Sequence, residues 1–531
     1  MPSAPLQQGV CVNLETLDIA ILAIYAVGIF VLAQWVSREK GAHQKDAQDY
    51  FLASRALPWW AIGTSLIAAN ISAEQIVGMS GSGYVMGMAI ASYEWMAALT
   101  LIIVGKWILP VFLKNGIYTM PEFLEKRYSP AVRTLMAIFW LILYVFVNLT
   151  SILWLGSLAV NAITGLDIQV SITALALFAL LYALYGGLKA VALTDIVQVT
   201  LLVLGGIIIT YIALDKVGDG AGVLAGFHKL TTLHPEKFDM ILSPDNPSYK
   251  ELPGLAVLLG GMWMMNVSYW GFNQYIIQRG LAAKSVNEAQ KGIVLAAFLK
   301  LVMPAIIVLP GIAALVLVPG LEKTDQAYPS LMAMLPVGIK GLVFAALVAA
   351  IVASTGSKIN SIATIFTMDL YRIARPNTEQ KKLVTVGRIV AVVSIVIAIF
   401  ITKPFLNNFK QGFQFIQDFT GFVTPGICVI FLLGLFWSRT TATAAMVAAL
   451  VTVLMAAAFR IWLPDYPFMN RVGWCFVVGM VIAIGISLMS PQKEAPMRVD
   501  IKNVDFKTGT FFNVSATLIV VILAALYYTW W

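Results

Sequence analysis

Long apolar runs dominate this sequence and restrict what the chain can fold into. Of its 531 residues, 60% are hydrophobic and 12% are charged, against roughly 25% charged residues in soluble domains. A membrane-spanning helix needs about 20 apolar residues, whereas a membrane β-barrel shows short alternating segments. Fourteen runs are long enough for such a helix, at residues 16–36, 58–80, 85–113, 131–163, 168–185, 190–214, 252–278, 290–318, 337–371, 385–402, 409–437, 441–463, 468–489 and 511–531. The sequence therefore predicts an all-α polytopic membrane protein with about 14 transmembrane helices.

Basic residues fall in alternate loops and indicate the orientation of these helices. The loop at 372–388 is rich in lysine and arginine, whereas residues 81–84 and 161–168 contain neither. Because short cytoplasmic loops carry an excess of basic residues, we place the basic loops inside. An even number of helices then puts both termini outside. The first apolar run lacks a preceding basic region and a cleavage site, so we expect it to be retained.

Composition also argues against several classes of function. The net charge of +8 arises from loops, so it reflects membrane topology and not nucleic-acid binding. Cys11, Cys428 and Cys475 are widely spaced and predict neither a disulfide framework nor a metal site. The three histidines form no recognisable set with a nucleophile, and we do not expect an enzyme. A membrane sensor or channel remains an alternative, although no selectivity-filter repeat is present.

Two apolar runs carry polar residues at their centres. The run at 58–80 contains Asn70, Glu74 and Gln75, and the run at 252–278 contains Asn266. Burying such groups in hydrocarbon costs several kcal/mol unless they find partners. Interrupted helices expose backbone carbonyls and helix ends that bind ions and polar solutes. A polar helix–helix contact is the alternative; we favour a solute or ion site.

Each interrupted run begins a set of five helices, which is typical of an inverted-repeat transporter. The pattern lies in hydropathy and in the polar interruptions, not in residue identity. It predicts an N-terminal helix and cytoplasmic loop, a first repeat, an extracellular loop, a second inverted repeat and three C-terminal helices, at residues 1–57, 58–214, 215–251, 252–437 and 438–531.

Several segments resemble the sodium/solute symporter family, and most closely its bacterial sodium/galactose branch. They are LIAANISAEQIVGMSGSGY (66–84), ASYEWMAALTLIIVGK (91–106), YWGFNQYIIQR (269–279), NSIATIFTMDLY (360–371) and GLFWSR (434–439). The resemblance implies a leucine-transporter-type five-plus-five inverted repeat. It also implies a symporter of the bacterial inner membrane that imports a hexose, galactose or glucose, together with Na⁺ and uses no organic cofactor.

The resemblance implies a set of sugar-binding side chains. Amides both donate and accept hydrogen bonds, carboxylates accept and lysines donate, which suits sugar hydroxyls. Lys300 could instead form a structural ion pair or extend to the interface, and Gln417 could cap a helix. The implied set is Asn70, Gln75, Glu94, Asn266, Lys300 and Gln417.

Aromatic residues are implied to close the cavity, because the C–H face of a sugar packs well on a ring. Tyr269 matches the inner gate, with Trp270 beside it. Met79, Tyr93 and Phe413 match an outer hydrophobic cover. Ordinary packing is the alternative for each of them.

Sodium ligands are implied at the first interruption and in the 337–371 run. They are the carbonyls of Ala68, Ile71 and Ala350 and the hydroxyl of Ser354. For Ser354 the alternative is a hydrogen bond back to its own helix. Asp195 matches a carboxylate near the ion's cytoplasmic exit path, and an interface position is the alternative for it.

The chain departs from the family pattern at two positions. Ala353 stands where a second hydroxyl is common, and Ala97 replaces a serine of the galactose branch. Weaker sodium binding and a changed sugar preference are the expected effects. Another solute, such as inositol, sialic acid or an amino acid, or coupling to protons, therefore remains an alternative.

Overall fold

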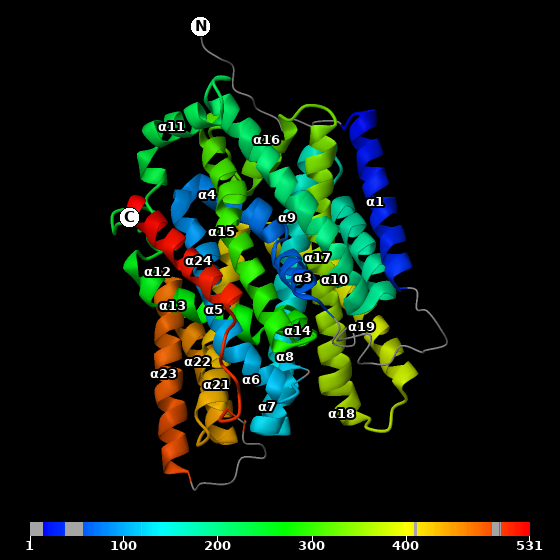
Figure 1. Ribbon diagram of the computed structural model, residues 1–531, viewed down its shortest axis with the longest axis vertical. Helices are drawn as coiled ribbons and strands as arrows, with labels where there is room; N and C mark the ends of the chain where they lie inside the picture. Colours follow the sequence, from blue (N-terminus) through cyan, green and yellow to red (C-terminus); the bar gives the residue numbers. More distant parts are fainter. Residues whose placement is uncertain (1–13, 38–56, 118, 408–410, 491–498, 500) are drawn as a thin grey trace.

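The computed structural model describes residues 14–37, 57–117, 119–407, 411–490, 499 and 501–531, and these residues form helices without a β-sheet (Figure 1). The helices of the first half are α1 (Thr16–Ser37), α3 (Trp59–Asn70), α4 (Ser80–Met86), α5 (Ser92–Ile103), α6 (Leu109–Lys114), α7 (Met120–Arg127), α8 (Pro130–Ile142), α9 (Thr150–Thr164), α10 (Ile168–Val217) and α11 (Val223–Leu233). Short π-helical or 3₁₀ turns, such as η2 (Glu74–Met79), join several of them.

The second half continues in the same manner. Its helices are α12 (Leu255–Leu259), α13 (Gly261–Val267), α14 (Gln274–Leu281), α15 (Val286–Leu317), α16 (Ala327–Ala333), α17 (Ile339–Thr364), α18 (Arg372–Ala374), α19 (Gln380–Leu406), α20 (Gly412–Thr420), α21 (Thr424–Phe436), α22 (Ala442–Trp462), α23 (Phe468–Met489) and α24 (Thr510–Thr529). Two further short turns matter below, η7 (Ser268–Phe272) and η9 (Ile365–Tyr371).

The first predicted interruption is confirmed as a break between α3 and η2. Helix α3 ends at Asn70, and Ile71 is extended with φ −79° and ψ 112°. The backbone N–H and the hydroxyl of Ser72 both donate to the side-chain oxygen of Gln75, at 3.2 Å each. The Ser72 hydroxyl in turn accepts from the N–H of Glu74 at 3.1 Å. The polar residues of this run therefore satisfy the free N–H groups that a broken helix leaves.

The run at 252–278 is also broken, but at Asn273 and not at the predicted centre, Asn266, which lies within α13. Asn273 is extended between η7 and α14 with φ −86° and ψ 122°. Its side-chain oxygen accepts a hydrogen bond from the Tyr144 hydroxyl. A neighbouring helix region thus supplies the polar partner that the break requires, as is usual for irregular backbone at membrane depth.

The boundary predicted between residues 185 and 190 is wrong. Helix α10 is continuous from Ile168 to Val217, and a straight helix of this length would be about 75 Å long. Its beginning contacts the end of α19, where the Gln169 amide donates to the Ile399 carbonyl at 3.1 Å. Its end packs against α11. These contacts place the beginning of α10 beside α19 and its end beside α11.

The structure supports fewer separate spans than the fourteen runs. Among the described residues, nine helices are long and apolar enough to cross a membrane, or ten if α20 and α21, bent by 46°, count as one. The broken runs divide into short pieces, and α1 contributes only a shorter apolar stretch. The chain is a multi-pass membrane protein, and the count of fourteen stays a prediction.

Contacts near the two described ends of the chain lie on one side of the molecule. The Asp18 carboxylate in α1 accepts from the N–H groups of Gly338 and Gly341 at the start of α17, at 2.7 and 2.8 Å. The Trp530 carbonyl accepts from the N–H of Met240, in the 215–251 loop, at 2.9 Å. Figure 1 shows α11 and α16 at this end and α7 and α18 at the opposite end. The basic segments of α7 and α18 thus share one side, as the loop pattern predicts.

Candidate functional site

A small cavity of about 70 Å³ lies between the two broken helices, below the range of about 300–1,000 Å³ typical of open small-molecule sites. Side chains from both halves of the chain line it. All six predicted sugar-binding residues are among them: Asn70, Gln75, Glu94, Asn266, Lys300 and Gln417. Residues separated by hundreds of positions in the chain are therefore gathered at one site.

Glu94 and Lys300 form a buried ion pair in this cavity. Glu94 is 3% exposed and Lys300 is 1% exposed, and the Lys300 Nζ donates to Glu94 Oε2 and to Asn70 Oδ1. The ammonium also lies 5.2 Å from the centre of the Trp270 ring. A buried charge requires such partners. Lys300 therefore does form an ion pair, which was the alternative to a sugar-binding role, but this ion pair lies inside the cavity.

Three of the four amides in the set, those of Gln75, Asn266 and Gln417, keep hydrogen-bonding groups available to a solute. Gln75 uses its oxygen to close the helix break. Asn266 donates to the Met262 carbonyl of its own helix at 3.2 Å, which leaves its side-chain oxygen. The backbone carbonyl of Gln417 accepts from the N–H of Gly421 at the end of α20, while the Gln417 side chain lines the cavity.

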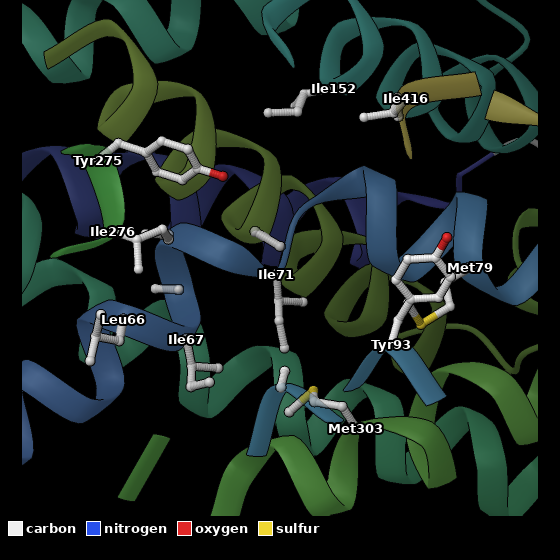
Figure 2. Close-up of a cluster of buried hydrophobic side chains, with 14 of the residues drawn as sticks. Leu66, Ile67, Ile71, Met79, Tyr93, Ile152, Tyr275, Ile276, Met303 and Ile416 are labelled. Carbon is white, nitrogen blue, oxygen red and sulfur yellow. The ribbon is translucent and has the colours of Figure 1, made fainter. Parts of the chain in front are cut away.

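Aromatic residues border the cavity on two sides. The Tyr269 hydroxyl accepts hydrogen bonds from Asn70 Nδ2 at 2.8 Å and from the Tyr275 hydroxyl at 2.6 Å. Tyr93 and Phe413 meet edge to face with ring centres 5.1 Å apart. Trp270 also lines the cavity, whereas Met79 is buried without lining it. Met79 and Tyr93 belong to the buried cluster of Figure 2.

The predicted sodium ligands lie at the end of α3 and in α17, which pack against each other. Ala68, Ile71, Ala350 and Ser354 are all buried. The Ser354 hydroxyl donates to the Ile351 carbonyl at 3.2 Å. This bond uses the proton and leaves the oxygen lone pairs, so the same hydroxyl can still ligate a cation.

Apolar side chains surround the break beside these positions. Figure 2 shows Ile67 and Ile71 of the α3 segment in one cluster with Ile276 of α14 and Met303 of α15. Each of these four side chains is buried. Such surroundings hold water away from an ion and strengthen its contacts with fixed oxygens. The side chain of Asp195 lies outside the described residues.

A second buried ion pair was not predicted from the sequence. Lys358 in α17 and Glu74 at the first break approach to 3.6 Å. The Lys358 Nζ lies 5.0 Å from the centre of the Tyr275 ring, and Tyr275 bonds Tyr269. A chain of contacts through Asn70 thus joins the two buried pairs. The signal was a lysine inside an apolar run, as at Lys300.

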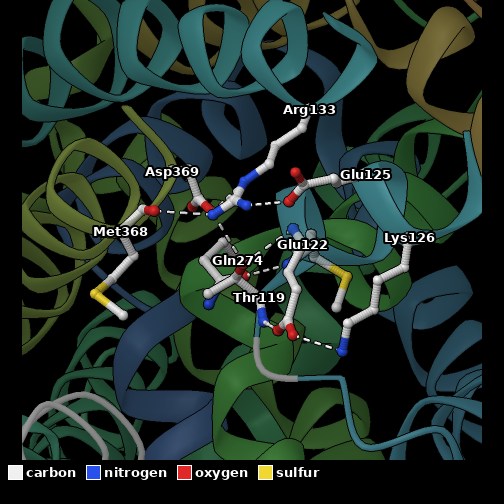
Figure 3. A network of polar contacts seen from close by, with 9 residues as sticks. Thr119, Glu122, Glu125, Lys126, Arg133, Gln274, Met368 and Asp369 are labelled. Atoms are coloured by element: carbon white, nitrogen blue, oxygen red, sulfur yellow. Dashed lines mark hydrogen bonds and ion pairs between the residues drawn. The ribbon is translucent and has the colours of Figure 1, made fainter. Parts of the chain in front are cut away.

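The end of the molecule with α7 and α18 carries a polar network that sequence reasoning also missed (Figure 3). Arg133 in α8 pairs with Asp369 in η9 at 2.7 Å and with Glu125 in α7. The Thr119 hydroxyl donates to Asp369 at 3.3 Å, and the Met120 N–H donates to Gln274 of α14 at 2.8 Å. Elements of both halves are therefore tied together beneath the cavity.

At the opposite end, Asp325 anchors the start of α20. Its Oδ2 accepts from the Gly412 N–H at 2.8 Å, directly before Phe413 of the cavity. Burial raises the pKa of Asp325 to about 7, against the opposing effects of the Gly412 N–H and the Lys323 charge. Within the described part of the chain, its other oxygen has no hydrogen-bond partner.

Comparison with known proteins identifies the family. The family model for the sodium:solute symporter family matches residues 50–452. A sodium/glucose cotransporter of Vibrio parahaemolyticus is 50% identical over 98% of this chain and 99% of its own. A human sodium/myo-inositol cotransporter is 30% identical over 93% of this chain and 76% of its own.

A solved structure has the same fold. A Na⁺-coupled sialic acid symporter in a substrate-bound, outward-open state superimposes with a TM-score of 0.79 at 23% identity, over 90% of this chain and 99% of its own. The family match covers most of the chain, and the bacterial cotransporter aligns with nearly all of it. The chain belongs to the sodium:solute symporter family.

Proposed function

We propose that this protein is a sodium-coupled symporter that imports a hexose, galactose or glucose, across a bacterial inner membrane, and that it is not an enzyme. The observation that carries the proposal is the cavity in which the Glu94–Lys300 pair meets the amides of Asn70, Gln75, Asn266 and Gln417. The relative that is 50% identical is a sodium/glucose cotransporter. When a sugar binds, its hydroxyls can form hydrogen bonds with these polar side chains in place of the bonds that the side chains make with each other.

The architecture in this proposal is a five-plus-five inverted repeat of residues 58–214 and 252–437, preceded by one helix and followed by three. Residues 215–251 form an extracellular loop, and both termini lie outside. The two helix breaks at corresponding positions of the halves support the repeat. The contacts of Asp18 and Trp530 lie on the same side of the molecule, which supports the placement of both termini on one side of the membrane.

The ion in this proposal is Na⁺, held by the carbonyls of Ala68, Ile71 and Ala350 and by the Ser354 hydroxyl. These oxygens belong to α17 and to the end of α3 with the residue that follows it. Sodium binding would favour the state in which both ligate it, and sugar must favour the same state for coupling to arise. Asp195 remains an expectation for the exit path.

Alternating access would open the cavity first on one side and then on the other. Tyr93 and Phe413 would cover the sugar from outside, with Met79 behind them, and Tyr269 with Trp270 would close it from inside. The Asn70–Tyr269–Tyr275 hydrogen bonds support this role for Tyr269, because they connect the gate to the cavity and to the first break.

A second candidate is a symporter of the same fold for another solute. Ala97 lines the cavity where the resemblance to the galactose branch implies a serine, so one hydrogen bond to a sugar would be missing. The relatives include proteins for myo-inositol and sialic acid. Protons are the alternative to sodium as the coupled ion, because Ala353 lacks the second hydroxyl that the family commonly has at its sodium site.

Equilibrium binding to the purified protein distinguishes these candidates. We would titrate galactose, glucose, myo-inositol and sialic acid in sodium chloride and in choline chloride at equal ionic strength. The proposal predicts binding of a hexose that is much tighter in sodium. Preference for another solute would favour the second candidate, and equal hexose affinity in both salts would contradict sodium coupling.

A further inference from the structure

The buried Glu74–Lys358 pair lies outside the cavity and is not used by the function proposed above. Lys358 is 0% exposed and Glu74 is 7% exposed. The Lys358 Nζ lies 3.6 Å from Glu74 Oε2, and among the described residues it has no hydrogen-bond partner. Glu74 Oε1, by contrast, accepts from the Ser151 hydroxyl of α9. The ammonium, with three donors, is therefore held by charge and by the Tyr275 ring.

The pair lies directly beside the proposed sodium ligands. Positions 350, 354 and 358 are spaced by four residues on α17 and share one face of the helix. Lys358 is thus just over one turn, about 6 Å, beyond Ser354. Glu74 follows Ile71 by three residues at the first break. The ion pair and the sodium ligands therefore both join α17 to the broken segment between α3 and η2.

A structural role explains this arrangement poorly. A buried ion pair is often no more stable than apolar residues of the same volume, and it needs further hydrogen bonds to offset desolvation. Lys358 makes none with the described residues. A positive charge this close to a cation site raises the free energy of the bound ion, whereas the Glu74 carboxylate lowers it.

We propose that Lys358 is a tethered cation that occupies a second cation position, formed by the Glu74 carboxylate and the Ser151 hydroxyl. This inference rests on the proposed sodium coupling of the neighbouring site. The ammonium neutralises Glu74, excludes an alkali cation from that position and weakens sodium binding one turn away. Lys358 thereby sets the ion affinity, and the number of ions bound, without touching the sugar.

Equilibrium binding of radioactive sodium to the purified protein tests this proposal. Lys358→Met removes the charge and keeps a long side chain. We expect the half-saturating sodium concentration to fall about tenfold and a second sodium ion to bind. In Glu74→Gln/Lys358→Met the second ion should be lost again. Lys340→Met is the matched control, because it removes a buried lysine from the start of the same helix, about 27 Å away, and should leave sodium binding unchanged.

A complementary variant keeps the test decisive if Lys358→Met does not fold. Glu74→Gln leaves the ammonium unneutralised, so sodium affinity should fall at least tenfold, whereas the neutral double variant should stay near the wild-type value. Wild-type sodium binding in Glu74→Gln, or in a folded Lys358→Met, would overturn the proposal and leave the pair a structural link.

The failure of the proposed function gives a different result. If the wild-type protein binds no sodium, sodium coupling is wrong, and Lys358→Met still tests the second position. A gain of sodium binding in that variant alone, lost on Glu74→Gln/Lys358→Met, would support the tethered cation. No gain would overturn it.

Discussion

Glu94 and Lys300 are the two charges of the proposed sugar site, and each is the main partner of the other. Their contact with Asn70 places a carboxylate, an ammonium and an amide within reach of one small solute. Such a cluster binds a sugar well only if the hydroxyls restore each hydrogen bond that they displace. Replacing one member should therefore affect sugar binding more strongly than sodium binding.

Glu94→Gln should weaken sugar binding in sodium by about 1.5–3 kcal/mol, the usual value of hydrogen bonds to charged groups. Glutamine keeps the volume and one acceptor but removes the charge that Lys300 pairs with. Isothermal titration with the preferred hexose measures the change. A folded Glu94→Gln protein with unchanged sugar affinity would remove Glu94 from the site.

Ser354 is the one side chain assigned to sodium, and its neighbour Ala353 supplies no oxygen. Ser354→Ala should lower sodium affinity up to about tenfold, equivalent to about 1.4 kcal/mol. Sugar affinity in sodium should fall with it, because linkage is reciprocal. Sugar binding in sodium-free buffer should stay the same, and Ala353→Ser should raise sodium affinity. Equal sodium titrations for all three proteins would contradict the assignment.

Helix breaks are the elements that the sequence predicts best. Asn70 and Gln75, and Asn266 in the second half, are polar residues in apolar runs, and a polar group at this depth has few uses other than a break or a site. The boundary expected between residues 185 and 190 is wrong because one lysine and two glycines are not enough to end a helix, and α10 continues through them. A single charge in an apolar run did not by itself reveal its partner.

Long-range pairings explain the other differences. Glu74–Lys358 and Arg133–Asp369 each join segments far apart in the chain. The local sequence pattern identifies the charged residues, but it does not show which distant segments pack together and so which charges pair. The resemblance to a family supplied the cavity residues for the same reason: it carries three-dimensional information that spacing along the chain lacks. Lys358 was missed because no motif included it.

Asp325, which holds the start of α20, should make the opening of the cavity toward the outside depend on pH. Its pKa is about 7 when buried and about 3.9 when exposed to water. The closed state therefore holds the proton more tightly and is favoured at low pH. As the pH rises from about 4 to about 7, the exposed carboxyl ionises first, and opening becomes progressively more favourable before the effect levels off.

The labelling rate of a cysteine introduced at Met79 measures this opening from outside. We expect the rate to increase between about pH 5 and pH 7 beyond the intrinsic change in thiolate reactivity. A cysteine at the exposed Asp245 provides that intrinsic reference. Asp325→Asn cannot ionise and should remove the excess. An identical pH profile with and without Asp325→Asn would show that this carboxyl does not control opening.

The whole molecule has a differently built contact region at each end. The ion pairs of Arg133 join α7, α8 and η9, and a hydrogen bond from the Met120 N–H to Gln274 adds α14 (Figure 3). The opposite end closes over the cavity through Asp325, Gly412 and the Tyr93–Phe413 contact. Alternating access requires each region to open in turn while the other holds.

The orientation of these two ends is a prediction that labelling can check. A cysteine at Lys382, at the start of α19, and another at Asp245, in the 215–251 loop, are both at exposed positions. In right-side-out vesicles, an impermeant reagent should label the Asp245 position and spare Lys382 until the membrane is permeabilised. Labelling of both from the same side would refute the proposed topology.

The coupling of sodium to hexose movement is the central claim, and uphill uptake into proteoliposomes tests it most directly. With sodium outside only, the internal concentration of labelled hexose should exceed the external one and should return to equality when a sodium ionophore is added. A proton gradient of the same size in sodium-free buffer should produce no accumulation. Accumulation driven by protons alone, unaffected by Ser354→Ala, would contradict the account.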